Sequence, residues 1–260
     1  MTYSAALYDE SDAEDDLERA QLRKLDFHVS QARASGAQRV LDVGCGWGSL
    51  LGRMVNSHGV QHTVGLTLSL AQAEQLGGVE DPRMEIRVEG WEEHEPDCTY
   101  DAVISIGAME HFTKPDLSIG EKVERYRDFF LRCHRWTREG AWLSLQTCAY
   151  GWLRRGDLDT SFVAKEIFPE SEFAHLSEIA KASEGVFEVV QLRNDRHDYA
   201  RTCRDWLGRL RARWPEAVLA VGETTALKWE RYLVMCVRGW ETGATALLRI
   251  AFRRIDRPRL

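Results

Sequence analysis

One short stretch constrains the fold more than any other: residues 40–48 read VLDVGCGWG. The apolar residues that end at Val43 are typical of a buried strand, and a helical pattern begins at about Ser49. Glycine has no Cβ and adopts backbone angles that other residues avoid, so a glycine-rich turn lets a ligand approach the main chain. The stretch predicts a strand, a ligand-binding turn and a helix in direct succession; a tight turn without a ligand is the alternative.

Strand and helix patterns alternate along most of the chain, which predicts a parallel sheet with helices on both faces. The expected strands are residues 39–43, 63–66, 84–88, 102–106, 141–147, 187–192 and 244–252. The expected helices are residues 17–34, 49–56, 69–75, 126–136, 203–214 and 224–239. The predicted fold class is α/β: one doubly wound domain over residues 1–260, with a mostly parallel seven-stranded sheet. A helical cap is expected from insertions at about 151–185 and 195–240.

Composition narrows the function classes. The chain has 34 Lys+Arg against 41 Asp+Glu, a net charge of -7, so nucleic acid is not an expected partner. No apolar run approaches the ~18 residues of a membrane span, so membrane contact is expected to be at most peripheral. The six cysteines form no C-x-x-C pair, and the acidic first residues lack a secretory pattern. We therefore expect a cytoplasmic protein with reduced thiols and no metal site.

The glycine spacing separates two cofactor classes. A nicotinamide fingerprint would place its third glycine at position 49, where the chain has Ser49. The G-x-G-x-G spacing after Asp42 resembles instead the first motif of S-adenosylmethionine (SAM) methyltransferases. The end of the second expected strand carries no carboxylate to hold a ribose, so Thr67 and Gln72 would supply the polar contacts.

Motifs along nearly the whole chain then point to a narrower family. The sequence resembles the cyclopropane-fatty-acid and mycolic-acid cyclopropane synthases, a branch of the Rossmann-like class I SAM methyltransferases. The matching stretches occur in the family's order: Tyr3-Ser4, Lys24-Leu25-Asp26, Gly44 to Gly48, Thr67-Leu68-Ser69, Gly90-Trp91-Glu92, Ser105 to Phe112, Glu166 to Pro169, and Tyr199 to Thr202.

The resemblance implies a SAM site that also binds the product S-adenosylhomocysteine (SAH). Its implied cofactor-binding residues are Tyr3, Ser4, Gly44, Gly46, Thr67, Leu68, Gln72, Trp91 and Ile106. Trp91 would offer a flat face to the adenine, and a purely structural core aromatic is the alternative. Ser4 would form a hydrogen bond with the methionine end of the cofactor.

The resemblance also implies the chemistry. Methylation of an alkene leaves a carbocation, and a proton must then leave in a site that excludes water. Cyclopropane synthases hold bicarbonate as the implied base with a Cys, a Glu, a His and a Tyr. Here Glu110 and Tyr199 are kept, whereas the Cys position is Ala5 and the His position is Gln146. The implied catalytic residues are therefore Glu110, Tyr199 and Gln146, with a bicarbonate site that is only partly kept.

This departure favours a SAM-dependent C-methyltransferase that leaves an alkene in a lipid-like or isoprenoid acceptor, in lipid or natural-product biosynthesis. Three alternatives stay open: a cyclopropane synthase acting on phospholipid, a small-molecule N- or O-methyltransferase, and a SAM-binding protein without turnover. A homodimer also stays open. Family members carry about thirty residues of helical lid before their Tyr-Ser motif, so a start at Met1 suggests a truncated or unusually open pocket.

Several further residues have two interpretations. Glu110 is either a proton acceptor or a structural hydrogen-bonding group. Glu166 and Glu170 are secondary catalytic candidates, Trp206 is either a pocket or a core residue, and His111 is expected near the site without binding a metal. The arginines after the expected strand 187–192 are either a solvated helix face or an entrance that attracts phosphate: Arg201, Arg204, Arg209, Arg211 and Arg213.

Overall fold

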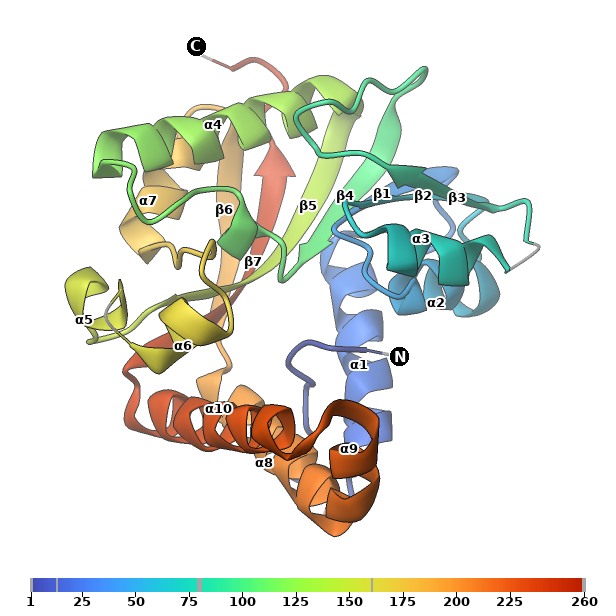
Figure 1. Cartoon of the computed structure of the whole chain (residues 1–260). Helices are drawn as coiled ribbons and strands as arrows, with labels where there is room; N and C mark the ends of the chain where they lie inside the picture. Colours follow the sequence, from blue (N-terminus) through green and yellow to red (C-terminus); the bar gives the residue numbers. More distant parts are fainter. Residues whose placement is uncertain (1, 13, 79–80, 160, 259–260) are drawn as a thin grey trace.

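The computed structural model describes residues 2–12, 14–78, 81–159 and 161–258. Its centre is a seven-stranded sheet with the order β3-β2-β1-β4-β5-β7-β6, in which only the pairs that involve β7 are antiparallel. This arrangement confirms the predicted mostly parallel, doubly wound sheet (Figure 1). The strands are β1 (Arg39–Val43), β2 (His62–Thr67), β3 (Met84–Val88), β4 (Tyr100–Ile106), β5 (Thr137–Tyr150), β6 (Phe187–Asn194) and β7 (Thr245–Arg254).

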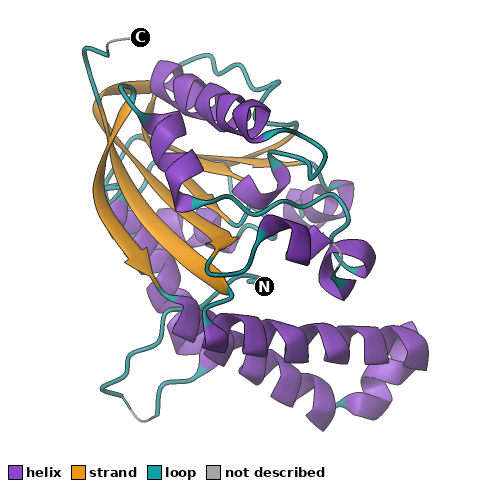
Figure 2. Ribbon diagram, turned by 90° about the vertical axis from the view of Figure 1, so that its left-hand side faces the viewer, coloured by secondary structure: helices purple, strands orange, loops and turns teal. Residues whose placement is uncertain are grey.

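Helices cover both faces of this sheet (Figures 1 and 2). On one face α1, α2 and α3 pack on the side chains of Val40 and Ile104, and on the other α4 and α7 pack on Leu41 and Val103. The alternation of burial along each strand follows from the opposite directions of successive side chains. The flanking helices are α1 (Leu17–Gln31), α2 (Ser49–Ser57), α3 (Leu70–Gly77), α4 (Ile119–Trp136) and α7 (Leu176–Ser183).

The helix α4 begins seven residues earlier than the sequence pattern predicts. Its first turns are polar, so the apolar pattern becomes visible only at Tyr126. A capping box fixes the true start, because the Ser118 hydroxyl accepts from the backbone N–H of Glu121 and the Glu121 carboxylate accepts from that of Ser118. A local capping signal therefore sets this boundary, and the apolar pattern does not.

The remaining helices lie beside the carboxyl ends of the parallel strands. The long helices α8 and α10 lie side by side (Figure 2). The apolar cluster between α6, α8 and α10 includes Val163, Leu207 and Tyr232. Only part of the expected cap insertion 151–185 therefore belongs to the cap. The helix α6 packs with the cap helices, whereas α7 packs on α4 at the sheet. These elements are η1 (Met109–His111), α5 (Arg155–Asp159), α6 (Phe162–Glu166), α8 (Arg196–Ala212), α9 (Trp214–Val221) and α10 (Glu223–Thr242).

The helix α9 was not expected from the sequence. Pro215 occupies its first turn, where a missing N–H costs nothing and the fixed φ favours a helix start. In the part of the chain that the structure describes, no helix is both long and apolar enough to cross a membrane.

Residues 2–8, named the strap from here on, run between α1 and α8. The backbone N–H of Leu7 donates to the carbonyl of Ala20 at 3.1 Å, and that of Ala6 donates to the hydroxyl of Thr202 at 3.0 Å. Ala5 and Ala6 are completely buried. The strap is therefore an integral part of the packing between the sheet and the cap, and it brings Tyr3 and Ser4 to the carboxyl ends of the strands.

Candidate active site

A cavity of about 730 Å³ lies at the carboxyl ends of β1, β2 and β4, between the sheet and the helical cap. Every residue that the sequence analysis assigned to the cofactor, and all three implied catalytic residues, line it. The cofactor group is Tyr3, Ser4, Gly44, Gly46, Thr67, Leu68, Gln72, Trp91 and Ile106, and the catalytic group is Glu110, Gln146 and Tyr199. The structure thus brings all of these side chains to one cavity, and their individual roles stay predictions.

The glycine-rich turn after β1 forms one wall of the cavity. Gly44 and Gly46 have φ values of +83° and +54°, in the region that side-chain-bearing residues avoid. A Cβ on Gly44 would lie only 2.6 Å from the Cβ of Ala108, which belongs to the turn after β4. The backbone N–H groups of Gly44 and Cys45 both donate to the carbonyl of Leu66, at 3.1 and 2.9 Å. The turn is therefore held tightly between the ends of three neighbouring strands.

The end of β2 supplies hydroxyl and amide groups in place of a carboxylate. The hydroxyl of Thr67 donates to Oε1 of Gln72 at 2.7 Å and accepts from the backbone N–H of Ser69 at 3.1 Å. Ser69 caps α3 by accepting from the backbone N–H of Gln72. Because Oε1 of Gln72 is occupied, its amide N–H groups are the part left to meet a bound molecule. Leu68 is 78% exposed beside these groups.

Trp91 belongs both to the cavity wall and to the core. It is buried, and its ring lies 5.2 Å from that of Phe112 and 5.6 Å from that of Phe129. The guanidinium of Arg125 lies over the same ring at 5.3 Å. Trp91 therefore packs in the core and also lines the cavity, and its contact with a cofactor stays a prediction.

The strap is fixed to α1 by two hydrogen bonds at Ser4. The ammonium of Lys24 donates to the hydroxyl of Ser4 at 2.8 Å, and the amide of Gln21 donates to its carbonyl at 2.8 Å. Tyr3, half exposed, stacks on Trp206 with the ring centres 4.9 Å apart. The strap end that lines the cavity is thus positioned by α1 on one side and by α8 on the other.

Two buried charged groups at the cavity were not assigned to the site from the sequence. Lys24 is 1% exposed, and burial together with the charge of Arg249 lowers its pKa to about 7. Asp42, 2% exposed, has its pKa raised to about 7 by burial. The available signal was a lysine next to Leu25 on the apolar face of the first helix, where a solvated side chain is not expected.

Glu110 lies on η1, directly after β4, and is 6% exposed. Its Oε1 accepts a hydrogen bond from the backbone N–H of Cys148 at 2.6 Å. Its Oε2 is buried and has no partner among the described residues. Leaving a carboxylate oxygen buried and unpaired costs free energy, so this atom is suited to receive a proton or a donor from a bound molecule.

Aromatic rings surround the side of the cavity that faces the cap. Tyr199 stacks on Trp240 with ring centres 4.6 Å apart, and Tyr232 and Phe168 meet edge to face at 5.8 Å. Burial raises the pKa of Tyr199 well above its usual value, so its hydroxyl stays protonated and neutral. This wall combines large apolar surfaces with the electron-rich ring faces that attract positive charge.

Gln146 is buried in β5, and its side-chain oxygen has two nitrogen neighbours at hydrogen-bonding distance. Its Oε1 lies 2.8 Å from Nε of Arg249 and 3.2 Å from Nε2 of His28. Among the described residues, no protein group accepts from its amide nitrogen. Because Gln146 lines the cavity, this N–H₂ group is available to a bound molecule that carries an acceptor.

The secondary candidates named from the sequence differ in whether they line the cavity. Glu170 and His111 line the cavity, and His111 lies 3.0 Å from the hydroxyl of Ser171. Glu166 pairs with Lys228 and does not line it. Among the described residues, no group of three His, Cys, Asp or Glu side chains could hold a metal.

The five arginines between residues 201 and 213 favour the solvated-face interpretation. Four of them form ion pairs with glutamates, and none of the five lines the cavity. Arg201 lies over the ring of Tyr8 at 4.0 Å and donates to the carbonyl of Asp15. The ion pairs are Arg204–Glu241, Arg209–Glu18, Arg211–Glu230 and Arg213–Glu216.

Comparisons with known proteins place the chain beside cyclopropane synthases and fatty acid methyltransferases. The family described as "Mycolic acid cyclopropane synthetase" matches residues 1–250. Cyclopropane mycolic acid synthase 3 of Mycobacterium tuberculosis is 29% identical, over 94% of this chain and 86% of that protein. The probable fatty acid methyltransferase Rv3720 of the same organism is 32% identical, over 98% of this chain and 58% of its own length.

Solved structures show the same architecture. The cyclopropane synthase MmaA2 from Mycobacterium tuberculosis superimposes with a TM-score of 0.85 at 26% identity, covering 97% of this chain and 90% of that one. The mycolic acid cyclopropane synthase CmaA1, complexed with SAH and CTAB, gives a TM-score of 0.84 at 26% identity with the same coverage.

Proposed function

The chain belongs to the mycolic acid cyclopropane synthetase family of SAM-dependent methyltransferases, and from this premise we propose that it methylates a carbon–carbon double bond. The proposed acceptor is an unsaturated lipid-like or isoprenoid molecule, and the proposed product keeps a double bond. One observation carries the proposal: Glu110 lines an otherwise largely apolar and aromatic cavity, and its buried Oε2 has no hydrogen-bond partner among the described residues.

The cavity wall fits SAM. The close approach of the Gly44 backbone to Ala108 leaves the turn without side chains where a ligand would press on it. Ser4, Thr67 and Gln72 offer polar groups, and Trp91 offers a ring. When bound, SAM supplies a sulfonium methyl group that an electron-rich acceptor can attack.

The acceptor side of the cavity suits a positive charge that forms after methyl transfer. A methyl group added to one carbon of a double bond leaves the neighbouring carbon cationic, and the rings of Tyr199, Tyr232 and Trp240 offer faces that stabilise it. Their burial also excludes water, which would otherwise trap the cation as an alcohol. Oε2 of Glu110 then takes the proton from a carbon next to the cation, and the C–H electron pair forms the new double bond.

The residues present do not rebuild a site for bicarbonate. Ala5 has no polar side chain, and Oε1 of Gln146 is already occupied by Arg249 and His28. The remaining groups are the amide N–H₂ of Gln146 and Oε2 of Glu110. We therefore assign the proton to Glu110 itself and derive no step through bicarbonate.

The test uses SAM with a trideuterated methyl group and two acceptor pools, unsaturated phospholipid vesicles and soluble prenyl diphosphates. A methylated alkene keeps all three deuterium atoms, whereas a cyclopropane keeps two, because its proton leaves from the transferred methyl group. We expect three, detected by mass spectrometry. Two would identify a cyclopropane synthase, and transfer only to nitrogen or oxygen acceptors would overturn the proposal.

The variant E110Q tests the proton acceptor. A glutamine can still accept from the N–H of Cys148, so SAH affinity stays unchanged, but its amide takes up no proton and turnover falls about 10²–10⁴-fold. The matched control is E166Q, since Glu166 pairs with Lys228 and does not line the cavity. Equal rates for E110Q and E166Q would exclude Glu110 as the base.

A further inference from the structure

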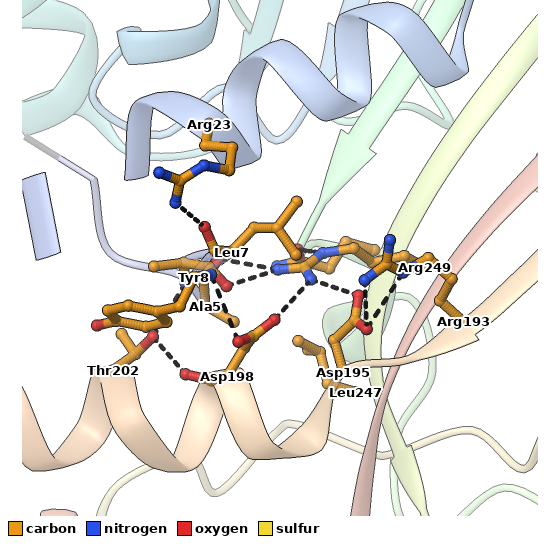
Figure 3. Close-up of polar contacts among 12 residues, drawn as sticks. Ala5, Leu7, Tyr8, Arg23, Arg193, Asp195, Asp198, Thr202, Leu247 and Arg249 are labelled. Atoms are coloured by element: carbon orange, nitrogen blue, oxygen red, sulfur yellow. Dashed lines mark hydrogen bonds and ion pairs between the residues drawn. The ribbon is translucent and has the colours of Figure 1, made fainter. Parts of the chain in front are cut away.

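Arg249 is a completely buried arginine in β7 that does not itself line the cavity. Its Nη1 donates to Asp195 at 2.5 Å, and its Nε donates to Oε1 of Gln146 at 2.8 Å. Its Nη2 donates to the carbonyls of Ala6 at 2.8 Å and Ala5 at 3.4 Å (Figure 3). A single guanidinium therefore contacts the strap, β5 and the segment that leads into α8.

The contact with Gln146 fixes the direction of its amide. Arg249 and Gln146 lie directly opposite each other in the antiparallel pair of β5 and β7. Oε1 only accepts, and the permanently charged guanidinium of Arg249 is a donor in every case, so Oε1 turns toward Arg249. Nε2 of His28 lies 3.2 Å from the same oxygen, and burial and the charges of Arg249 and Lys24 hold the pKa of His28 well below its usual value. The amide N–H₂ of Gln146 is thereby turned away from the guanidinium.

Hydrogen bonds from Arg249 also hold the strap in place at Ala5 and Ala6. The carbonyls of these two residues accept from Arg249, whereas the N–H of Ala6 donates to Thr202 on α8. The strap continues directly to Ser4 and Tyr3, which line the cavity. A change at Arg249 therefore moves the strap and the Gln146 amide together.

We propose that Arg249 is a positioning residue that couples the strap, at the cofactor end of the cavity, to the amide of Gln146, at the acceptor end. A planar guanidinium with five N–H donors can serve three directions at once, which a single lysine ammonium cannot. The proposed coupling between the strap and the Gln146 amide is argued only from the hydrogen bonds of Arg249. Its effect on turnover rests on the proposed function.

The first test compares R249K with the matched control R193K. Lysine at 249 keeps the charge beside Asp195, so the fold retains its buried ion pair. Arg193 also donates to Asp195, at 3.1 Å, but none of its hydrogen bonds goes to the strap or to Gln146. We expect amide hydrogen exchange in residues 5–8 about tenfold faster and SAH binding about tenfold weaker in R249K, with R193K unchanged in both. Wild-type exchange and affinity in a folded R249K would overturn the proposal.

The second test changes the partner of Arg249 on β5, Gln146. Q146M removes the acceptor of Nε at nearly constant side-chain volume. We expect faster exchange of residues 5–8 in Q146M, and no further increase when Q146M is added to R249K. Additive effects of the two substitutions, or an unchanged strap in Q146M, would refute the coupling. Q146M alone decides the matter if R249K does not fold.

A kinetic test separates this proposal from the proposed function. With an acceptor that the protein methylates, R249K lowers kcat for methyl transfer, and Q146M adds no further loss in the R249K background. If no alkene is methylated, the exchange and SAH measurements still decide the role of Arg249. The two proposals can thus fail independently.

Discussion

Replacing Gly44 with alanine tests whether the turn after β1 has room for any side chain. Gly44 has a φ of +83°, which strains every L-residue that carries a Cβ. The added Cβ would lie 2.6 Å from the Cβ of Ala108, well inside the contact distance of about 3.5–4.0 Å between carbon atoms. Both residues belong to turns that line the cavity, so relief of the clash must open the cofactor wall.

The cost has two parts. The left-handed backbone costs about 1–2 kcal/mol for a residue with a Cβ. Overpacking adds about 1–3 kcal/mol, so G44A is expected to lose about 2–5 kcal/mol of unfolding free energy. In G44A, SAH binding must also return the displaced turn to its wild-type position. Each 1.4 kcal/mol that this movement costs weakens SAH affinity about tenfold, and we expect affinity to fall at least tenfold.

Urea unfolding and calorimetric titration with SAH measure the two quantities. The matched control is G36A, because Gly36 also has a positive φ, +73°, but no atom of the described residues lies within 4 Å of the position of its added Cβ. G36A should lose about 1–2 kcal/mol and bind SAH like the wild type. The reasoning is refuted if G44A binds SAH with wild-type affinity, or if it loses no more stability than G36A.

Two further substitutions test buried charges elsewhere in the fold. The unfolded chain keeps the Lys24 proton up to about pH 10.5 and the folded chain only to about 7, so the wild type gains stability as the pH rises through this window. K24M should lack this gain in urea unfolding between pH 7 and 10; a parallel pH profile would contradict it. E172Q removes a 1% exposed carboxylate that pairs with Arg155 and with the buried Lys122, at 2.5 and 3.4 Å. We expect a loss of about 3–5 kcal/mol, and a change in melting temperature of only a degree or two would argue against a buried ion pair here.

The parts of the fold that the sequence predicts well are those whose signals are local. The strand before Gly44 is predicted with its observed bounds, Arg39–Val43, because an apolar run and a glycine-rich turn define its two ends. The first strand, turn and helix also place Gly44 and Gly46 at the cavity. The starts of α4 and α9 depend on one capping serine and one proline, which the apolar pattern does not reveal.

The buried cations at and beside the cavity, Lys24 and Arg249, could not be predicted, because their partners lie far away in the sequence. Arg249 interrupts the apolar run of the last strand and by composition would be placed on a solvated face. Its partners Gln146 and Asp195 lie 103 and 54 residues earlier, and only the pairing of β5 with β7 and the turn into α8 bring them together. Lys24 reaches Ser4 only because the strap folds back along α1.

Ala5 and Gln146, the two positions where the resemblance predicts departures from the cyclopropane synthase pattern, contact the same side chain in the structure. Arg249 donates to the carbonyl of Ala5 and to the side chain of Gln146, so both positions share a buried guanidinium as a neighbour. A histidine at 146 would stand directly beside that permanent charge, and burial and repulsion would both disfavour its protonated form. A glutamine accepts from the guanidinium without carrying charge, and it keeps an N–H₂ group for the cavity. An amide at 146 is therefore well matched to a buried arginine at 249, because it accepts from the guanidinium and brings no second charge beside it.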